Sequence, residues 1–283
     1  MNYRHAFHAG NFADVLKHAV LALCISYLKE KPAPFRVIDT HAGIGRYDLA
    51  GIEAGKTLEW IDGVGRLLGI DAPSAPPDVA PLLEPYLDIV RKMNRGGALS
   101  LYPGSPMVAR ALLRSDDRLV VNELHPQDNA ALAALFKDDA QVKVMAMDGW
   151  TAVRALTPPP ERRGLLLIDP PFEAPGEFDR LAQGLADARK RFATGVMVLW
   201  YPVKDLRAVG AFYERIDGMG EMKSLRAELF IRAPAEGVFS GCGLLVVNPP
   251  WTLKAQLEKL GPFLADRMAK GPGARFMQKS RGD

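Results

Sequence analysis

The 283-residue sequence contains only two cysteines, Cys24 and Cys242, far apart in the chain. They offer neither the paired spacing of a zinc site nor a disulfide framework, so we expect reduced thiols in a cytoplasmic protein. Long apolar runs are also missing, because the clearest ones cover only 164–168 and 243–247, whereas crossing a bilayer takes about 20 residues. The first residues, MNYRHAFHAGN, lack the apolar segment of a secretory signal. We therefore expect neither membrane spanning nor export.

Charge of one sign is scarce as well. The net charge of +3 at pH 7 is too small to indicate a nucleic-acid-binding protein by itself. Its distribution is uneven, since 267–283 carries five basic side chains against one carboxylate. A second basic group consists of Arg189, Lys190, Arg191, Lys204 and Arg207. Such groups suit phosphate contacts, but a solvated helix face or a frayed tail is the commoner explanation.

Apolar patterns predict strands and helices that alternate along the second half of the chain. The predicted strands are 118–124, 142–148, 164–169 and 195–202, and the predicted helices are 126–137, 149–157 and 177–192. This alternation is typical of a doubly wound parallel sheet. The sheet would be preceded by a helix over 12–31 and a strand over 35–39, and closed by a hairpin of strands near 224–232 and 241–251. The sequence thus indicates an α/β fold.

The segment 52–98 differs in composition from its surroundings. It places five prolines between stretches of helical periodicity: Pro73, Pro76, Pro77, Pro81 and Pro85. Predicted strands resume after it. We therefore interpret 52–98 as an inserted helical subdomain within a domain formed by 1–51 and 99–283.

Four predicted strands end in, or just before, an acidic residue: Asp39, Glu123, Asp148 and Asp169. In open α/β sheets the carboxyl ends of the strands share one edge, and ligands bind there. Carboxylates at this edge can accept hydrogen bonds from ribose hydroxyls and from an adenine amino group. The four acids therefore predict a single crevice suited to a nucleotide.

The loop DTHAGIGRY follows the first of these strands, and its glycines Gly43 and Gly45 would let a ligand approach the backbone. It is not a Walker A loop, because no Gly-Lys-Ser/Thr follows. Nor is it a full G-x-G-x-x-G motif, because Asp48 stands in place of the last glycine. Taken alone, it suits a plain turn equally well.

The stretch GLLLIDPPFEAP, 164–175, leads an aliphatic strand into an acid, two prolines and an aromatic ring. Prolines cannot continue a sheet ladder, so the strand should stop at Asp169. An acid that caps a turn is the simple structural interpretation. The alternative is that Asp169, Pro170 and Phe172 meet a ligand at the edge of the sheet.

In this order, the motifs resemble S-adenosylmethionine-dependent amino-methyltransferases of the Rossmann-like class. More narrowly, the stretches YRHAFHAGNFADVLKH, DTHAGIGRY, YPGSP, NELHP, MDGW, LIDPPF and LWYPV resemble the bacterial 23S ribosomal RNA adenine-N6 methyltransferase family RlmJ, from Tyr3 to about Trp251. The resemblance implies a mostly parallel seven-stranded sheet with an antiparallel C-terminal hairpin. It also implies S-adenosylmethionine as cofactor and 23S ribosomal RNA as substrate.

The resemblance assigns site residues as well. The residues implied to hold the cofactor are His18, Asp39, His41, Gly43, Ser105, Glu123, Asp148, Gly149 and Asp169. Asp169 is also the implied catalytic acid, and Tyr3 and Arg4 would meet the RNA. The sequence departs from the family at Phe172, where such enzymes more often have tyrosine, so a hydrogen bond from that hydroxyl would be lost.

The mechanism that follows uses the Asp-Pro-Pro-Phe segment. The Asp169 carboxylate and the Pro170 carbonyl would accept the two hydrogens of an exocyclic adenine amine, which aims its lone pair at the methyl donor. Asp169 would then take the proton. Phe172 would stack on the base after it has been pulled from its neighbours.

Simpler interpretations stay open for single residues. His18 lies on an apolar helix and suits a structural histidine, and Ser105 could cap a helix. A second Pro-Pro-aromatic motif follows Asn248, but the order of the strands favours Asp169. His5 and His8, taken with His18, have no acidic or cysteine partner at ligand spacing, so we expect no metal.

Two alternative functions are methylation of DNA adenine and non-catalytic RNA binding. A DNA enzyme would need a module that reads duplex DNA, and none is recognisable. We expect a monomer that contacts RNA through its N-terminal segment, the insertion and the basic residues 189–191.

Overall fold

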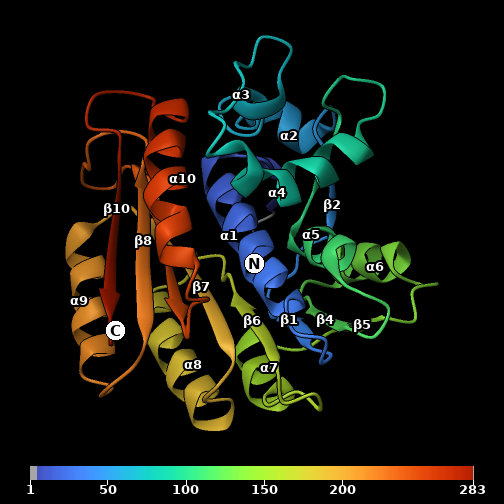
Figure 1. Ribbon diagram of the computed structural model, residues 1–283, viewed down its shortest axis with the longest axis vertical. Coiled ribbons are helices and arrows are strands. Elements are labelled where there is room, and N and C mark those ends of the chain that lie inside the picture. Colours follow the sequence, from blue (N-terminus) through green and yellow to red (C-terminus); the bar gives the residue numbers. More distant parts are fainter. Residues whose placement is uncertain (1–4, 283) are drawn as a thin grey trace.

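The computed structural model describes residues 5–282 and contains one large sheet of eight strands in the order β10-β8-β9-β7-β6-β1-β4-β5 (Figure 1). Five strands are parallel: β1 (Arg36–Asp39), β4 (Arg118–Asn122), β5 (Val142–Met145), β6 (Gly164–Ile168) and β7 (Val196–Val203). Three are antiparallel: β8 (Ser224–Phe230), β9 (Gly241–Val247) and β10 (Arg275–Arg281). The predicted parallel sheet with an antiparallel C-terminal hairpin is confirmed.

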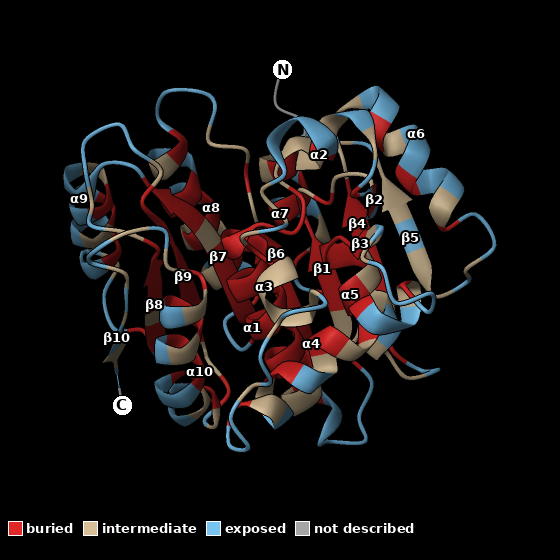
Figure 2. Cartoon of the chain, turned by 90° about the horizontal axis from the view of Figure 1, so that it is seen from above, coloured by how far each residue is buried: buried red, intermediate tan, exposed pale blue. Residues whose placement is uncertain are grey.

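Helices cover both faces of this sheet. One face carries α1 (Phe12–Lys29), α5 (Ser105–Leu112) and α10 (Leu253–Arg267), and the other carries α7 (Gly149–Leu156), α8 (Glu177–Arg191) and α9 (Leu206–Asp217). The inner strands of the sheet are mostly buried, as Figure 2 shows, whereas the edge strand β5 is partly exposed. In β6, Leu165 and Leu167 enter one core while Leu166 and Ile168 enter the other. This explains the continuous apolar run of the strand.

The eighth strand corrects the prediction of seven. The basic tail forms β10, which pairs with β8 from Arg275 opposite Phe230 to Arg281 opposite Ser224. Its inward residue Phe276 packs on α10 at Gly261, where a Cβ atom would lie 2.1 Å from the ring. The charged side chains face outward on an edge strand, where they protect the sheet from pairing with other chains. The strand was missed because its inward positions are Phe276, Gln278 and Ser280, so no apolar alternation marks it in the sequence.

The segment 52–98 forms three helices, α2 (Ile52–Thr57), α3 (Gly65–Leu68) and α4 (Ala80–Met93). It is bracketed by a two-stranded ribbon of β2 (Arg46–Asp48) and β3 (Leu101–Pro103), which the sequence analysis missed. Helix α4 packs on α1, and its buried residues share the main core with that helix. The proposed subdomain boundaries stay a prediction.

Helix α1 carries two of the side chains that line the cavity described below, Lys17 and His18. Asn11 starts it by accepting hydrogen bonds from the backbone amides of Ala13 and Asp14 at 2.9 and 3.1 Å. The helix lies in the core between the sheet and α4, so even its polar residues Lys17 and His18 are buried. Within 5–282, no helix has both the length and the apolar character needed to cross a membrane.

Candidate functional site

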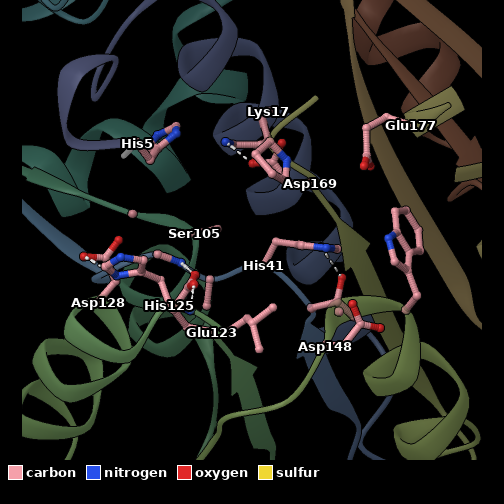
Figure 3. Close-up of a pocket in the computed structure, with 18 of the residues that line it drawn as sticks. His5, Lys17, His41, Ser105, Glu123, His125, Asp128, Asp148, Asp169 and Glu177 are labelled. Atoms are coloured by element: carbon pink, nitrogen blue, oxygen red, sulfur yellow. Dashed lines mark hydrogen bonds and ion pairs between the residues drawn. The ribbon is translucent and has the colours of Figure 1, made fainter. Parts of the chain in front are cut away.

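A cavity opens at the edge of the sheet where the parallel strands end, with an empty volume of about 960 Å³ that includes its open mouth (Figure 3). Eight residues named by the sequence analysis line it: His18, His41, Gly43, Ser105, Glu123, Asp148, Gly149 and Asp169. They come from α1, from the start of α5 after β3, and from loops or helix starts after the parallel strands β1, β4, β5 and β6. The crevice predicted from the acidic strand ends is therefore present.

Asp39 and Ser105 form a buried pair beside this cavity. Asp39, 1% exposed, accepts a hydrogen bond from Ser105 Oγ at 2.6 Å and one from the His41 backbone amide at 3.3 Å. Burial raises the pKa of Asp39 to about 6; the Ser105 hydrogen bond opposes this rise, and the charge of Asp169 adds to it. Ser105 is the first residue of α5, and its hydroxyl binds this acid instead of capping the helix.

Glu123 joins the second strand end to the glycine loop. Its Oε2 accepts a hydrogen bond from the Gly43 amide at 2.9 Å, and its Oε1 accepts one from the His125 amide at 2.8 Å. Gly43 has φ +60°, and a Cβ atom there would lie 2.3 Å from the Tyr47 hydroxyl. Glycine is therefore required both by the backbone conformation and by the close contact.

His41, Asp148 and Gly149 meet at the start of α7. Asp148 caps this helix by accepting a hydrogen bond from the Thr151 amide at 2.9 Å. A side chain at position 149 would collide with His41, because a Cβ atom there would lie 2.2 Å from Nε2. Burial lowers the pKa of His41 to about 4, although Asp169 and Asp148 oppose the shift. The imidazole is therefore neutral at physiological pH.

His18 combines the structural interpretation with the ligand-binding one. It is 1% exposed, and its Nδ1 lies 2.9 Å from the Tyr102 hydroxyl. Burial lowers its pKa to about 3, so the ring is neutral. Its Nε2 is buried and has no hydrogen-bond partner among the described residues. One nitrogen therefore serves the core, and the other is left without a hydrogen bond from the described residues.

Asp169 has a partner that the sequence analysis missed. Lys17 Nζ donates to Asp169 Oδ2 at 2.5 Å and lies 2.8 Å from Asp14 Oδ1, as Figure 3 shows for Asp169. Asp14 Oδ2 in turn lies 3.0 Å from His5 Nε2. Burial alone would lower the pKa of Lys17, but Asp14 and Asp169 hold it well above its ordinary value. The signal in the sequence was two opposite charges three residues apart on an otherwise apolar helix.

After Asp169, the Asp-Pro-Pro-Phe segment lies only partly at the cavity. Phe172 has φ +50°, and its ring packs edge-on against Phe178 and Trp200 with centroids 4.9 and 5.9 Å apart. Pro171 lines the cavity, whereas Pro170 and Phe172 are not among the described lining residues. The predicted roles of these two residues stay predictions. Tyr3 and Arg4 lie outside the described residues.

The two Pro-Pro-aromatic motifs lie at opposite ends of the strands, one at the carboxyl ends of the parallel strands and the other at their amino ends. Strand β9 runs antiparallel to β7, and its last residue, Val247, pairs with Met197 near the start of β7. The Asn248 amide then donates to the carbonyls of Ala193 and Gly195 at 2.7 and 2.9 Å. Asn248 therefore closes a loop, while Asp169 faces the cavity.

The two halves of the second basic group are also separated. Lys204 and Arg207 follow β7, at the edge of the sheet where the cavity opens. The residues 189–191 end α8, which begins at the cavity with Glu177 and runs away from it. Arg189 binds the carbonyls of Met219 and Glu221 at 3.2 and 2.8 Å. The predicted RNA contact at 189–191 thus falls on the far edge of the sheet.

Five parallel strands, an antiparallel extension and one cavity ringed by strand-end acids define the class of Rossmann-like methyltransferases. The family model described as "Ribosomal RNA large subunit methyltransferase D, RlmJ" matches residues 32–279. The chain belongs to this family.

Individual relatives cover nearly the whole chain. The Ribosomal RNA large subunit methyltransferase J of Escherichia coli is 41% identical over 95% of this chain and 94% of its own. The protein of the same name from Haemophilus influenzae is 41% identical over 97% of this chain and 96% of its own. A crystal structure of a Legionella pneumophila protein superposes with a TM-score of 0.88 at 35% identity and covers 98% of this chain and 99% of its own.

The raised pKa of Asp39 predicts how stability depends on pH. Between its ordinary value of 3.8 and about 6, the folded state holds a proton that the unfolded state releases, so this carboxyl makes stability fall as pH rises through that window. Asp39→Asn should remove this contribution. The free energy of unfolding of the variant, minus that of wild type, should rise by about 1 to 3 kcal/mol between pH 4 and pH 7.5. Urea unfolding at the two pH values measures it.

Asp116→Asn is the matched control, because it also removes one carboxylate, but from an exposed position. It should follow the wild-type pH profile. If Asp39→Asn follows that profile too, Asp39 titrates near its ordinary value, and the burial argument is wrong.

The buried ion cluster predicts a large cost for removing its cation. Lys17→Met leaves two carboxylates facing each other, and the free energy of unfolding should fall by about 3 to 5 kcal/mol. The double variant Asp14→Asn, Lys17→Met should recover part of this loss, because only one of the two charges then lacks its partner. Urea unfolding at pH 7.5 measures both. A loss below about 1 kcal/mol in the single variant would show that the cluster is open to water.

Proposed function

We propose that this chain transfers a methyl group from S-adenosylmethionine to the N6 amino group of an adenine in 23S ribosomal RNA. The observation that carries the proposal is the position of Asp169. This acid ends the buried strand β6, precedes Pro-Pro-Phe and faces the cavity next to the glycine loop. Membership in the RlmJ family supports ribosomal RNA over DNA as the substrate.

The residues of the cavity fit the cofactor. Glu123 and Asp148 offer carboxylate oxygens to hydroxyl or amino groups, and Gly43 allows close approach of the backbone. The unpartnered Nε2 of the buried His18 offers a polar contact that the protein itself does not use. When bound there, S-adenosylmethionine supplies an electrophilic methyl group on its sulfonium. His18, Asp39, His41, Ser105 and Gly149 complete the proposed set.

Asp169 and Pro170 would position the substrate nitrogen. An exocyclic amine is a poor nucleophile while its lone pair is delocalised into the ring. The Asp169 carboxylate and the Pro170 carbonyl would accept its two hydrogens and orient that lone pair. Lys17 ties Oδ2 of Asp169 at 2.5 Å, which holds the carboxylate in place. Asp169 is then the acceptor of the proton that the amine releases.

Phe172 would contribute by stacking on the flipped base, for about 1 to 3 kcal/mol. Its ring already packs at the outer side of the segment against Phe178 and Trp200, and it lacks the hydroxyl found in many relatives of this chemistry. Tyr3 and Arg4 are proposed as RNA contacts. We further propose a cytoplasmic monomer, and the buried free thiols Cys24 and Cys242 suit a reducing compartment.

Asp169→Asn tests the catalytic assignment. It keeps the shape of the side chain but can no longer accept the proton, so methyl transfer to 23S ribosomal RNA should fall by about 100-fold or more. Incorporation of a labelled methyl group measures the rate, and calorimetry with S-adenosylhomocysteine checks that the cofactor site survives. The control is Asn248→Ala, in the second Pro-Pro-aromatic motif, which should keep activity once folded. Retained transfer by Asp169→Asn would refute the mechanism.

The substrate assignment has its own test. Ribosomal RNA from a strain that lacks this gene should be missing one N6-methyladenosine in its 23S component, as read by mass spectrometry of nuclease fragments. The wild-type gene should restore that modification, and the Asp169→Asn gene should not. A map that is unchanged by the deletion would remove 23S ribosomal RNA as the substrate.

A further inference from the structure

Three buried polar side chains connect the inserted segment to the cavity. Tyr86 on α4 lies with its hydroxyl 2.8 Å from the hydroxyl of Tyr102 on β3. The Tyr102 hydroxyl lies 2.9 Å from Nδ1 of His18 on α1. Both tyrosines are 0% exposed, and the Tyr102 and His18 rings stack with centroids 5.6 Å apart. The chain of contacts ends at His18, a residue that lines the cavity and whose Nε2 has no hydrogen-bond partner among the described residues.

The number of hydrogens available sets the direction of this chain. If Tyr86 donates to Tyr102 and Tyr102 donates to Nδ1, each hydroxyl hydrogen has an acceptor, and the imidazole hydrogen sits on Nε2. In the reverse direction Nδ1 donates to Tyr102 and Tyr102 donates to Tyr86. The Tyr86 hydrogen would then have no acceptor, because its hydrogen bonds within the described chain run to Tyr102 alone, and Nε2 would be a bare acceptor without a donor. The first direction leaves only the Nε2 hydrogen without a partner, whereas the reverse leaves two groups unsatisfied. Each buried unsatisfied group costs about 1 to 3 kcal/mol.

Charge does not override this choice. Burial is the largest effect on the pKa of His18 and lowers it, and the charges of Lys17 and His5 act in the same direction. Asp14 alone favours the protonated ring, and it does not overcome burial, so the ring stays neutral. A neutral imidazole has one hydrogen to place, and the nitrogen that carries it is set by the partner of the other nitrogen. For His18 that partner is Tyr102.

We propose that Tyr102, oriented by Tyr86 of the inserted segment, holds His18 in the tautomer with its hydrogen on Nε2, so that His18 offers an N–H donor to the cofactor's carboxylate. This inference rests on the proposed use of S-adenosylmethionine, whose only anionic group is that carboxylate. Tyr102 and Tyr86 are thus positioning residues. The inserted segment becomes part of the cofactor site through one hydroxyl.

The tautomer can be observed without any ligand. Two-dimensional ¹H–¹⁵N spectra of the imidazole rings distinguish a protonated from an unprotonated nitrogen, and His18→Gln identifies the His18 signals among the five histidines. In the wild-type protein we expect Nε2 protonated and Nδ1 bare. The opposite pattern would overturn the proposal whatever the protein methylates, since no methyl transfer is measured.

Binding tests the consequence. Tyr102→Phe keeps the ring but removes the hydroxyl, and it should weaken S-adenosylhomocysteine by about 3- to 10-fold in calorimetry. It should leave 5′-methylthioadenosine, which lacks the amino-acid end, within about twofold. Tyr86→Phe should act in the same direction more weakly, because it removes only the donor to Tyr102.

The matched control is Tyr213→Phe, which breaks another tyrosine pair, the 2.7 Å contact between the Tyr201 and Tyr213 hydroxyls away from the cavity. It should bind both probes as wild type does. Unchanged binding of S-adenosylhomocysteine by Tyr102→Phe, or equal weakening of both probes, would contradict the proposal. Absent methyl transfer together with the expected tautomer and binding would count against the proposed function alone.

Discussion

The ion cluster around Lys17 is the constraint on which the site depends. A buried ammonium between Asp14 and Asp169 ties the N-terminal helix α1 to the end of β6. Charges out of water are stable only when they are paired with good geometry. The cluster therefore fixes where α1 lies along the sheet, and α1 carries His18 in the next position. One interaction thus sets the positions of Asp169 and of the His18 imidazole together.

The topology explains why so few contacts suffice. Parallel strands β1, β4, β5 and β6 bring their carboxyl ends to one edge, so the acids that follow them converge without any long-range recognition in the sequence. Each is then oriented by a hydrogen bond: Asp39 by Ser105 and Glu123 by Gly43, both from distant parts of the sequence, and Asp148 by Thr151, three residues further on. The strand order supplies proximity, and these hydrogen bonds supply direction.

The parallel sheet and the strand-end acids of the cavity, Glu123, Asp148 and Asp169, could be predicted because both follow local rules. The other cofactor residues of the cavity, such as His18 and Ser105, came from the family resemblance. Aliphatic runs mark buried strands, and proline or glycine marks where they end. The role of Lys17 was hidden because a charge within an apolar helical stripe is indistinguishable from a surface residue until the partner of the helix is known. The contact between Tyr86 and Tyr102 was also hidden, because the two residues are 16 positions apart and meet only where α4 of the inserted segment packs beside β3. The strand β10 was missed because basic composition suggested a tail.

The two halves of the cavity differ in how completely they are built. Among the residues proposed for the cofactor, the acids Asp39, Glu123 and Asp148 have hydrogen bonds in place, and Gly43 and Gly149 fit against Tyr47 and His41 with no room to spare. The segment after Asp169 instead holds Phe172 in a left-handed conformation, which costs a non-glycine residue about 1 to 3 kcal/mol. Its ring is kept by aromatic neighbours outside the cavity lining. A rigid cofactor half beside a strained substrate half is what an enzyme needs if its base must be extracted from folded RNA, because the donor site can be complete before the base arrives.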